Sequence, residues 1–284
     1  MSDTLRPPVA PVWDDARVAG WLASAPARER QLAPISEALF AHAALRPGER
    51  VLDVGVGTGP TTATAREAVQ PDGTVTGIDI AEAMIEAAKR VVSAPDIEWL
   101  VGDVTTYAFP AAAYDVVISR FGVMFFSDPV AAFTRLHDAV RPGGRLAVAT
   151  WCRLEATALF GIPYTIATTT LNRLGVDYTP LPSDFTMFSL GDPARVGELL
   201  GAAGWREVRS VPDNRIVYAG GASTAQAAAD DALQSGPLRM LLEGLPDDSV
   251  AEVRSALLDD FSRRADGNGV PFPAGFMITT AVRG

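Results

Sequence analysis

Residues 51–59 read VLDVGVGTG, a short apolar strand that ends in three glycines at alternate positions. Gly55, Gly57 and Gly59 let the backbone turn sharply and approach a ligand without side-chain clash. A segment with helical character follows, and the first N–H groups of a helix have no partner inside it. The stretch therefore predicts a strand, a ligand-binding loop and a helix, in that order.

Two later strands each end in an acid. The run TVTGID ends at Asp79, and the run IEWLVGD ends at Asp103. Parallel strands bring their carboxyl ends to one edge of a sheet, where ligands bind. An acid about 20 residues beyond the last glycine can accept both hydroxyls of a ribose. A lone strand-end acid is more often a helix cap, but the order and spacing of all three features favour a site for a nucleoside-bearing ligand.

Strands and helices alternate regularly through the first half of the chain. The expected strands are 51–54, 74–78, 97–101, 115–119 and 145–150, and the expected helices are 60–69, 82–92 and 129–139. This alternation predicts a parallel sheet with helices on both faces. Residues 46–152 form this unit in our division of the chain.

The flanking regions are mainly helical. Residues 1–45 predict an N-terminal segment with two helices, one near residues 13–22 and one near residues 35–42. Residues 153–284 predict helical pieces at 153–190, a helix at 192–200, strand pieces at 206–211 and 216–218, helices at 223–245 and 248–265, and a last strand at 276–282.

The motifs in their order resemble the class I S-adenosylmethionine-dependent methyltransferases, especially the ubiquinone-biosynthesis-type and natural-product branch. They are VLDVGVGTG, then GIDI, GD, RFGVMFF and RPGGRLAVATW. The similarity is strong over about residues 35–153 and loose elsewhere. It implies an α/β, Rossmann-like, doubly wound sheet of seven mostly parallel strands with the last strand antiparallel. It also implies a helical cap over the substrate, made of residues 153–190 and 222–265.

The resemblance implies S-adenosyl-L-methionine as cofactor and S-adenosyl-L-homocysteine as product. Asp53 would steady the glycine loop and help to hold the cofactor's amino group, Asp79 would bind the ribose, and Asp103 would accept from the adenine amino group. Arg120 and Phe121 would lie beside the sulfonium and the substrate mouth. The expected cofactor residues are Asp53, Gly55, Gly57, Thr58, Gly59, Asp79, Ile80, Met84, Gly102, Asp103, Val104, Arg120 and Phe121.

Methyl transfer from a sulfonium needs alignment of the acceptor and exclusion of water more than it needs a side-chain base. A base helps where the acceptor is a phenol, an acidic carbon or an amine. Our candidates are Tyr164 and Asp184 in the cap and His42 on an early helix. An apolar or aromatic small molecule is the expected substrate. The expected substrate-binding residues are Trp13, Trp21, Met124, Phe160, Tyr164, Phe185 and Phe188.

The composition argues against several other classes. The formal net charge is −10, which disfavours nucleic acid and anionic membrane surfaces as partners. There is no apolar run of ~18 residues and no signal-peptide pattern at the start. The single cysteine, Cys152, excludes an internal disulfide and suits the cytoplasm. One cysteine and two distant histidines predict no soft-ligand metal site. A homodimer through the cap stays open.

The glycine-rich loop also has two rival functional interpretations. A nicotinamide-dependent oxidoreductase would have two residues between its second and third glycines, whereas this chain has only Thr58 there. A relative that binds S-adenosylmethionine without transferring the methyl group, or that promotes a cyclisation, is the second rival. It stays open because alignment chemistry requires no signature residue.

Overall fold

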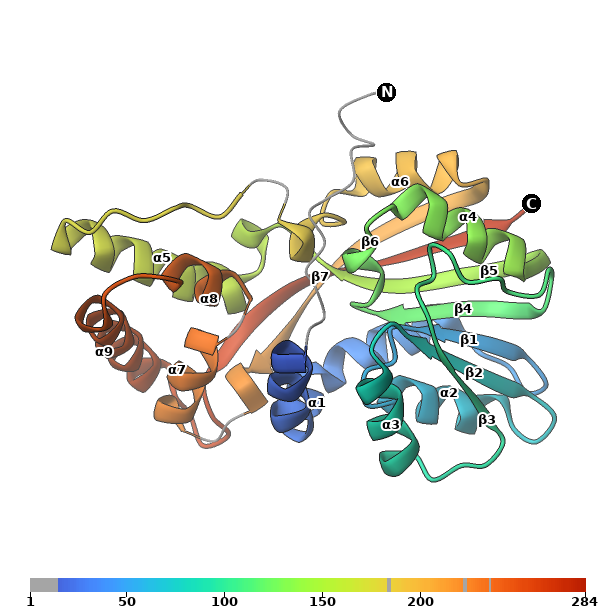
Figure 1. Ribbon diagram of the computed structural model, residues 1–284, viewed down its shortest axis with the longest axis horizontal. Coiled ribbons are helices and arrows are strands. Elements are labelled where there is room, and N and C mark those ends of the chain that lie inside the picture. Colours follow the sequence, from blue (N-terminus) through green and yellow to red (C-terminus); the bar gives the residue numbers. More distant parts are fainter. Residues whose placement is uncertain (1–14, 183–184, 222–223, 235) are drawn as a thin grey trace.

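The computed structural model describes residues 15–182, 185–221, 224–234 and 236–284. A seven-stranded sheet in the order β3-β2-β1-β4-β5-β7-β6 runs through the molecule (Figure 1). The strands are β1 (Arg50–Val54), β2 (Thr74–Asp79), β3 (Ile97–Val101), β4 (Tyr114–Arg120), β5 (Val140–Trp151), β6 (Trp205–Tyr218) and β7 (Pro271–Arg283).

Six strands run parallel, and β7 is antiparallel to both of its neighbours, β5 and β6. The predicted doubly wound fold with an antiparallel last strand is confirmed. The chain order reverses between β1 and β4, which lie side by side. In open α/β sheets this reversal point, at the carboxyl ends of the strands, is where ligands bind.

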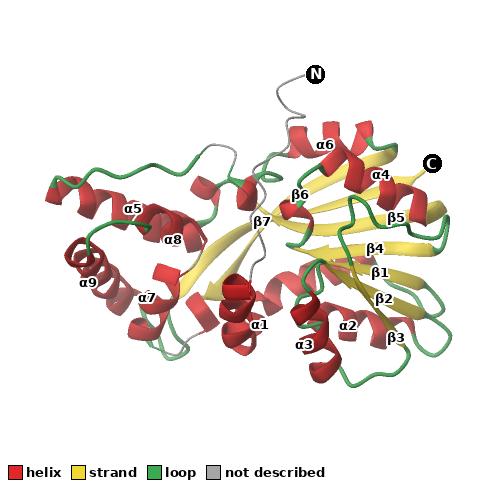
Figure 2. Ribbon diagram, in the orientation of Figure 1, coloured by secondary structure: helices red, strands yellow, loops and turns green. Residues whose placement is uncertain are grey.

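Helices cover both faces of the sheet (Figure 2). On one side lie α1 (Asp15–Ala43), α2 (Pro60–Val69) and α3 (Glu82–Val91), and on the other lie α4 (Pro129–Ala139) and α6 (Pro193–Ala202). The central strands are therefore shielded on both faces, which explains their continuous apolar runs. Val51, Leu52, Val116, Val117 and Ile118 have no exposed surface.

The β6–β7 pair extends beyond the end of β5. Pairing of β5 with β7 stops at Trp151 and Phe276, whereas β6 and β7 stay paired as far as Tyr218 and Pro271. Helices α5 (Ala158–Leu174), α7 (Ala225–Gln234), α8 (Gly236–Leu242) and α9 (Asp247–Arg264) pack together around this extension, to the left in Figure 1. The helical segments expected as a cap thus lie together, away from the main sheet.

The structure differs from the expected elements in two places. The two expected N-terminal helices are one helix, α1, which contains Pro26 and Pro34. Burial of Leu32 and Ile35 against the core holds the helix across these prolines. The strand pieces at 206–211 and 216–218 are a single strand, β6, which tolerates Pro212 because β6 is an edge strand. Of the helix expected at 223–245, the described residues form α7 and α8, on either side of residue 235, which lies outside them.

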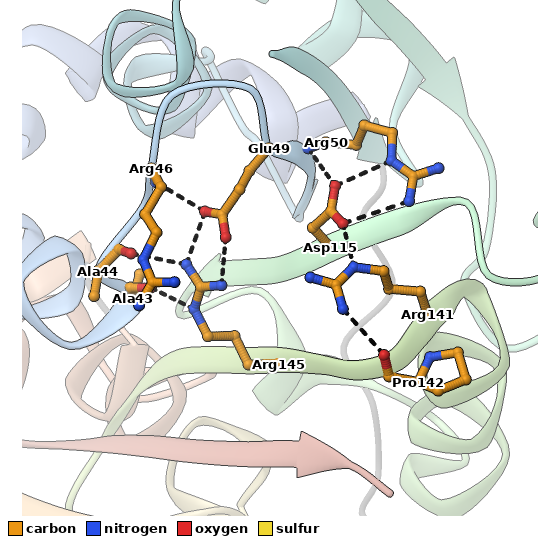
Figure 3. Close-up of polar contacts among 9 residues, drawn as sticks. All are labelled: Ala43, Ala44, Arg46, Glu49, Arg50, Asp115, Arg141, Pro142 and Arg145. Carbon is orange, nitrogen blue, oxygen red and sulfur yellow. Dashed lines mark hydrogen bonds and ion pairs between the residues drawn. The ribbon is translucent and has the colours of Figure 1, made fainter. Parts of the chain in front are cut away.

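A network of ion pairs joins the amino-terminal ends of β1, β4 and β5 (Figure 3). Asp115 accepts hydrogen bonds from the backbone N–H and the side chain of Arg50 and from Arg141. Burial alone would raise the pKa of Asp115, but these hydrogen bonds outweigh it and lower the pKa to about 2. Arg145 donates to both oxygens of Glu49, at 2.7 and 2.8 Å. Ion pairs therefore link the amino-terminal ends of these strands.

Candidate functional site

A cleft lies between α1 and the glycine loop, at the carboxyl ends of β1 and β4. The space between its walls, open solvent at its mouth included, is about 440 Å³. Its position is the reversal point of the sheet, where a ligand is expected. The lining residues are Trp21, Ala25, Arg28, Glu29, Leu32, Gly55, Val56, Gly57, Thr58, Pro60, Thr61, Arg120 and Phe121.

The three loop glycines are needed for different physical reasons. All have positive φ angles, +71° at Gly55, +55° at Gly57 and +83° at Gly59. A Cβ at Gly55 would lie 2.7 Å from the Cα of Gly122, and one at Gly59 would lie 3.0 Å from the Trp99 ring. These two positions need glycine for close packing. Gly57 lines the cleft, and its nearest neighbour there is Trp21 Nε1, 3.5 Å from the position of a Cβ.

Asp53 lies beneath the loop and is completely buried. Its Oδ2 accepts from the hydroxyls of Thr61 and Thr62, both at 2.7 Å, so it fastens the start of α2 to the end of β1. Its Oδ1 has no hydrogen-bond partner among the described residues. Burial raises the pKa of Asp53 to about 6, against the opposing effect of the two hydroxyls. A positively charged ligand group nearby would stabilise the ionised form.

Asp79 lies at the end of β2 and reaches the glycine loop. Its Oδ2 accepts from the Gly57 N–H and its Oδ1 from the Ala81 N–H, both at 3.0 Å. Each carboxylate oxygen keeps a further lone pair for a ligand hydroxyl. Burial raises the pKa of Asp79, and the hydrogen bonds from Ala81 and Gly57 oppose the rise. The structure thus brings the first strand-end acid and the glycine loop together.

The second strand-end acid lies beside the first. The Gly102 N–H donates to the Asp79 backbone oxygen at 2.9 Å, which joins the ends of β2 and β3. Asp103 Oδ1 accepts from the Thr105 N–H at 2.8 Å. The side chain of Ile80 is half exposed next to Asp79, whereas Val104 and Met84 are buried. Ile80 therefore offers an apolar surface at this edge, and Met84 belongs to the packing of α3.

These residues fit a nucleoside with a charged tail. Asp79 and Asp103 supply carboxylate acceptors for hydroxyl and amino groups, the Gly57 backbone is open to the cleft, and Asp53 has an orphaned buried acceptor. The donor set therefore suits S-adenosylmethionine. The assignment of each residue to a part of that molecule stays a prediction.

Arg120, expected beside the sulfonium, is bound to α1. It donates to both oxygens of Glu29, at 2.9 and 2.5 Å, and to the Ser36 hydroxyl at 2.5 Å. Its neighbour Phe121 has φ +66° and stacks on Trp151 with 4.0 Å between ring centroids. A positive φ is a strained conformation for a bulky side chain and is found preferentially at functional sites.

Several expected substrate residues lie in one series of aromatic contacts. Trp151 contacts Phe160, Phe160 contacts Phe188, and Phe188 contacts Phe185, with ring centroids 5.1, 6.1 and 6.0 Å apart. The series therefore continues from Phe121 at the cleft to the cap. Met124 is buried, with its Sδ accepting from the Trp151 N–H at 3.3 Å, so it lies in the wall behind this series.

The two candidate bases that the structure describes, Tyr164 and His42, are not brought to the cleft. The Tyr164 hydroxyl accepts from the Leu181 N–H at 2.8 Å, inside the cap region. His42 is exposed near the end of α1, where Arg145 holds the Ala43 carbonyl at the opposite edge of the sheet. Asp184 and Trp13 lie outside the described residues. The roles of all four stay predictions.

Sequence reasoning missed several residues of this site, among them Arg28, Glu29 and Gly122. Arg28 and Glu29 line the cleft from α1, and no motif in the helix marks them. Gly122 packs against Gly55, and its signal was its place directly after the RF pair at the end of β4. Trp21, which was expected here, does line the cleft, and the Arg28 guanidinium lies over its ring at 4.6 Å.

Within the described ranges, His, Cys, Asp and Glu side chains form no group of three or more that could hold a metal ion. None of the described helices has the length and apolar character needed to span a membrane.

Comparisons with known proteins agree with this geometry. A family model described as a methyltransferase domain matches residues 51–144. Nocamycin O-methyltransferase of Saccharothrix syringae is 30% identical over 255 residues, 84% of this chain and 86% of that protein. Aklanonic acid methyltransferase DauC of Streptomyces sp. (strain C5) is 40% identical over 121 residues, 42% of this chain and 52% of that protein.

The fold has a similar solved structure with the cofactor bound. Phosphoethanolamine N-methyltransferase 2 of Haemonchus contortus, in complex with S-adenosyl-L-methionine, aligns with a TM-score of 0.51 at 18% identity. The alignment covers 88% of this chain and 52% of that chain. This chain therefore belongs to the class I S-adenosylmethionine-dependent methyltransferases, and its cofactor is S-adenosyl-L-methionine.

Proposed function

We propose that the protein transfers the methyl group of S-adenosyl-L-methionine to an oxygen or carbon of a small, largely apolar metabolite. Its acceptor would be a polyketide, a quinone or a similar secondary product. The names of two relatives, nocamycin O-methyltransferase and aklanonic acid methyltransferase, support this class of substrate.

The observation that carries the proposal is the aromatic series that begins at the cleft. Phe121 lines the cleft and stacks on Trp151, and the contacts continue through Phe160 to Phe188 on the side of the cap. Aromatic side chains bind planar apolar molecules by stacked or edge-to-face contacts. Phe160 and Phe188 are partly exposed, so an acceptor with a ring system would find a complementary surface at this end of the series.

Methyl transfer requires the chain mainly to position the acceptor and to exclude water. When bound, the cofactor supplies a methyl group already activated on a positively charged sulfur. The chain's residues would orient the acceptor along the line of displacement, and the cap of residues 153–190 and 222–265 would exclude water. Residues 1–45 would act as a lid, since α1 covers the glycine loop. Tyr164 is the candidate base among the described cap residues.

The test is an assay with a methyl-labelled donor and a panel of phenolic and quinone-type acceptors. We expect label in an acceptor, with its position read by NMR, and release of S-adenosyl-L-homocysteine. Binding of the cofactor with no transfer across the panel, together with rearrangement of an unlabelled substrate, would favour the cyclisation rival. Binding of NAD in preference to S-adenosyl-L-homocysteine would overturn the proposal.

A further inference from the structure

Arg28 places a second cationic group in the wall of the cleft, one turn of α1 away from Leu32. It lines the cleft together with Trp21, and its guanidinium lies over the Trp21 ring at 4.6 Å. Trp21 in turn approaches the open side of Gly57. Arg28 therefore lies across the cleft from the glycine loop, over the part of the site expected to hold the cofactor's amino-acid end.

The hydrogen-bonding capacity of Arg28 is largely unused. A guanidinium carries five N–H donors. Among the described residues, Nη2 donates to the Ser24 hydroxyl at 3.1 Å, and the buried Nε has no partner. The carboxylate of Asp231, from α7, lies 3.8 Å from Nη2, which is too long for a hydrogen bond. Three-quarters of the side chain is nevertheless buried.

Arg120, the other cation of the cleft, is different. Its guanidinium makes two hydrogen bonds to Glu29 and one to Ser36, so its charge is compensated directly. At Arg28, by contrast, burial lowers the pKa and the attraction of Asp231 offsets it only in part. Because arginine stays charged at neutral pH, the cleft contains one cation that lacks a hydrogen-bonded anion among the described residues.

We propose that Arg28 binds the carboxylate of the cofactor's amino-acid part from the lid helix. A planar guanidinium matches a carboxylate with two parallel hydrogen bonds. A carboxylate on the acceptor has the same chemistry, but the position of Arg28 beside Trp21 and the glycine loop favours the cofactor as its source. Asp231 then attracts Arg28 from the cap side, so that Arg28, which belongs to the lid helix, links the cap to the ligand.

The test compares two ligands on each protein, in the absence of acceptor. S-adenosyl-L-homocysteine and its decarboxylated analogue differ only in the carboxylate. By calorimetry, we expect the wild-type protein to bind the former about 10- to 100-fold more tightly, the range for hydrogen bonds to a charged group. In Arg28→Met this preference should fall to within about threefold. The comparison is internal to each variant, so a general change in stability affects both ligands alike.

Arg30→Met is the matched control. Arg30 lies on the same helix and also reaches toward the cap side, donating to the Gly221 carbonyl at 3.1 Å, but it does not line the cleft. Its substitution removes the same charge and should leave the preference for the carboxylate unchanged. A preference that persists in Arg28→Met would overturn the proposal. The proposal rests on the cofactor assignment, whose own failure would appear differently, as a wild-type protein that binds neither ligand.

Discussion

Arg120 at the end of β4 and Glu29 on α1 are joined by two hydrogen bonds, 2.9 and 2.5 Å long, across the mouth of the cofactor cleft. The pair fastens α1 over the site and places a neutralised cation where the sulfonium is expected. Bidentate arginine–carboxylate pairs of this kind combine geometric specificity with strength. The arrangement therefore has consequences for ligand charge.

Glu29→Gln should weaken binding of S-adenosyl-L-methionine more than binding of S-adenosyl-L-homocysteine. The substitution leaves the Arg120 charge uncompensated beside a cationic sulfonium, whereas the product has a neutral sulfur. A repulsion of about 1 kcal/mol changes the ratio of the two dissociation constants about fivefold. Calorimetric titration of both ligands measures the ratio. An equal loss for both would show that Glu29 only holds the helix.

Asp53→Asn should stabilise the free protein at pH 8 while weakening cofactor binding. The folded-state pKa of Asp53 is raised from 3.8 to about 6. Protonated Asp53 therefore makes its full contribution to the stability of the folded protein below about pH 4, and this contribution is lost as the pH rises through 6. Asparagine stays neutral at every pH, so at pH 8 the variant should keep up to about 3 kcal/mol of folding stability that the wild type has lost.

Thermal melts of Asp53→Asn at pH 4 and pH 8 check this expectation. The gain over wild type should be present at pH 8 and absent at pH 4. The variant should also bind S-adenosyl-L-homocysteine about tenfold more weakly, if the carboxylate attracts the ligand's ammonium group. A variant less stable than wild type at pH 8 would contradict the account.

Gly57→Ala and Gly55→Ala should fail in different ways. Among the residues that the structure describes, a Cβ at Gly57 meets only Trp21 Nε1, at 3.5 Å, so the expected cost is the strain of a positive φ, about 1 kcal/mol. It should nevertheless lower cofactor affinity, since the methyl group enters the cleft. A Cβ at Gly55 would meet Gly122 Cα at 2.7 Å, which displaces the backbone. Its melting temperature should fall by clearly more than that of Gly57→Ala, and the reverse order would refute this reading of the loop.

Phe160→Leu should raise the KM for the acceptor found in the methyl-transfer assay and leave the affinity for S-adenosyl-L-homocysteine unchanged. Phe160 contacts Trp151 and Phe188 but does not line the cofactor cleft. Leucine keeps much of the apolar volume and removes the ring contacts, worth about 1 kcal/mol. Steady-state kinetics and calorimetry on the same preparation separate the two effects. A changed cofactor affinity with an unchanged KM would show that Phe160 acts on the cofactor and not on the acceptor, which would contradict the prediction.

The cofactor half of the fold could be predicted from the sequence because its signals are local. The strand, glycine loop and helix at residues 51–69 follow directly from apolar runs and glycine spacing, and the parallel order brings Asp79 and Asp103 to one edge. Glu29 and Arg28 could not be predicted. Their role depends on α1 lying across the cleft, which is a long-range packing relation without a sequence motif.

The helix and strand boundaries that were missed have a similar cause. Pro26 and Pro34 argue locally for a break in α1, but burial of Leu32 and Ile35 outweighs that preference. Pro212 argues against a continuous strand, but β6 lies at the sheet edge, where a missing N–H donor is tolerated. Local preference was overridden by tertiary contacts in both elements.

The two ends of the sheet offer the most direct test. Asp79 and Asp115 are carboxylates at opposite ends of two parallel strands, β2 and β4, that lie on either side of β1. Asp79 is hydrogen-bonded to the glycine loop, and Asp115 is paired with arginines. The central claim is that the first holds the cofactor. The second, Asp115, is expected to stabilise the fold. Its pKa is lowered to about 2, so its ionised form stabilises the folded protein above about pH 4, and this contribution is lost as the pH falls through 2.

The measurement is titration of S-adenosyl-L-homocysteine into Asp79→Asn and Asp115→Asn, each with a melting curve at pH 7. We expect Asp79→Asn to lose about 30-fold or more in affinity. Its melting temperature should also fall somewhat, because the amide nitrogen cannot replace the oxygen that accepts from the Gly57 or the Ala81 N–H. Asp115→Asn should lose about 1–3 kcal/mol of stability and keep the wild-type affinity. Undiminished binding by Asp79→Asn would contradict the claim that this carboxylate holds the cofactor.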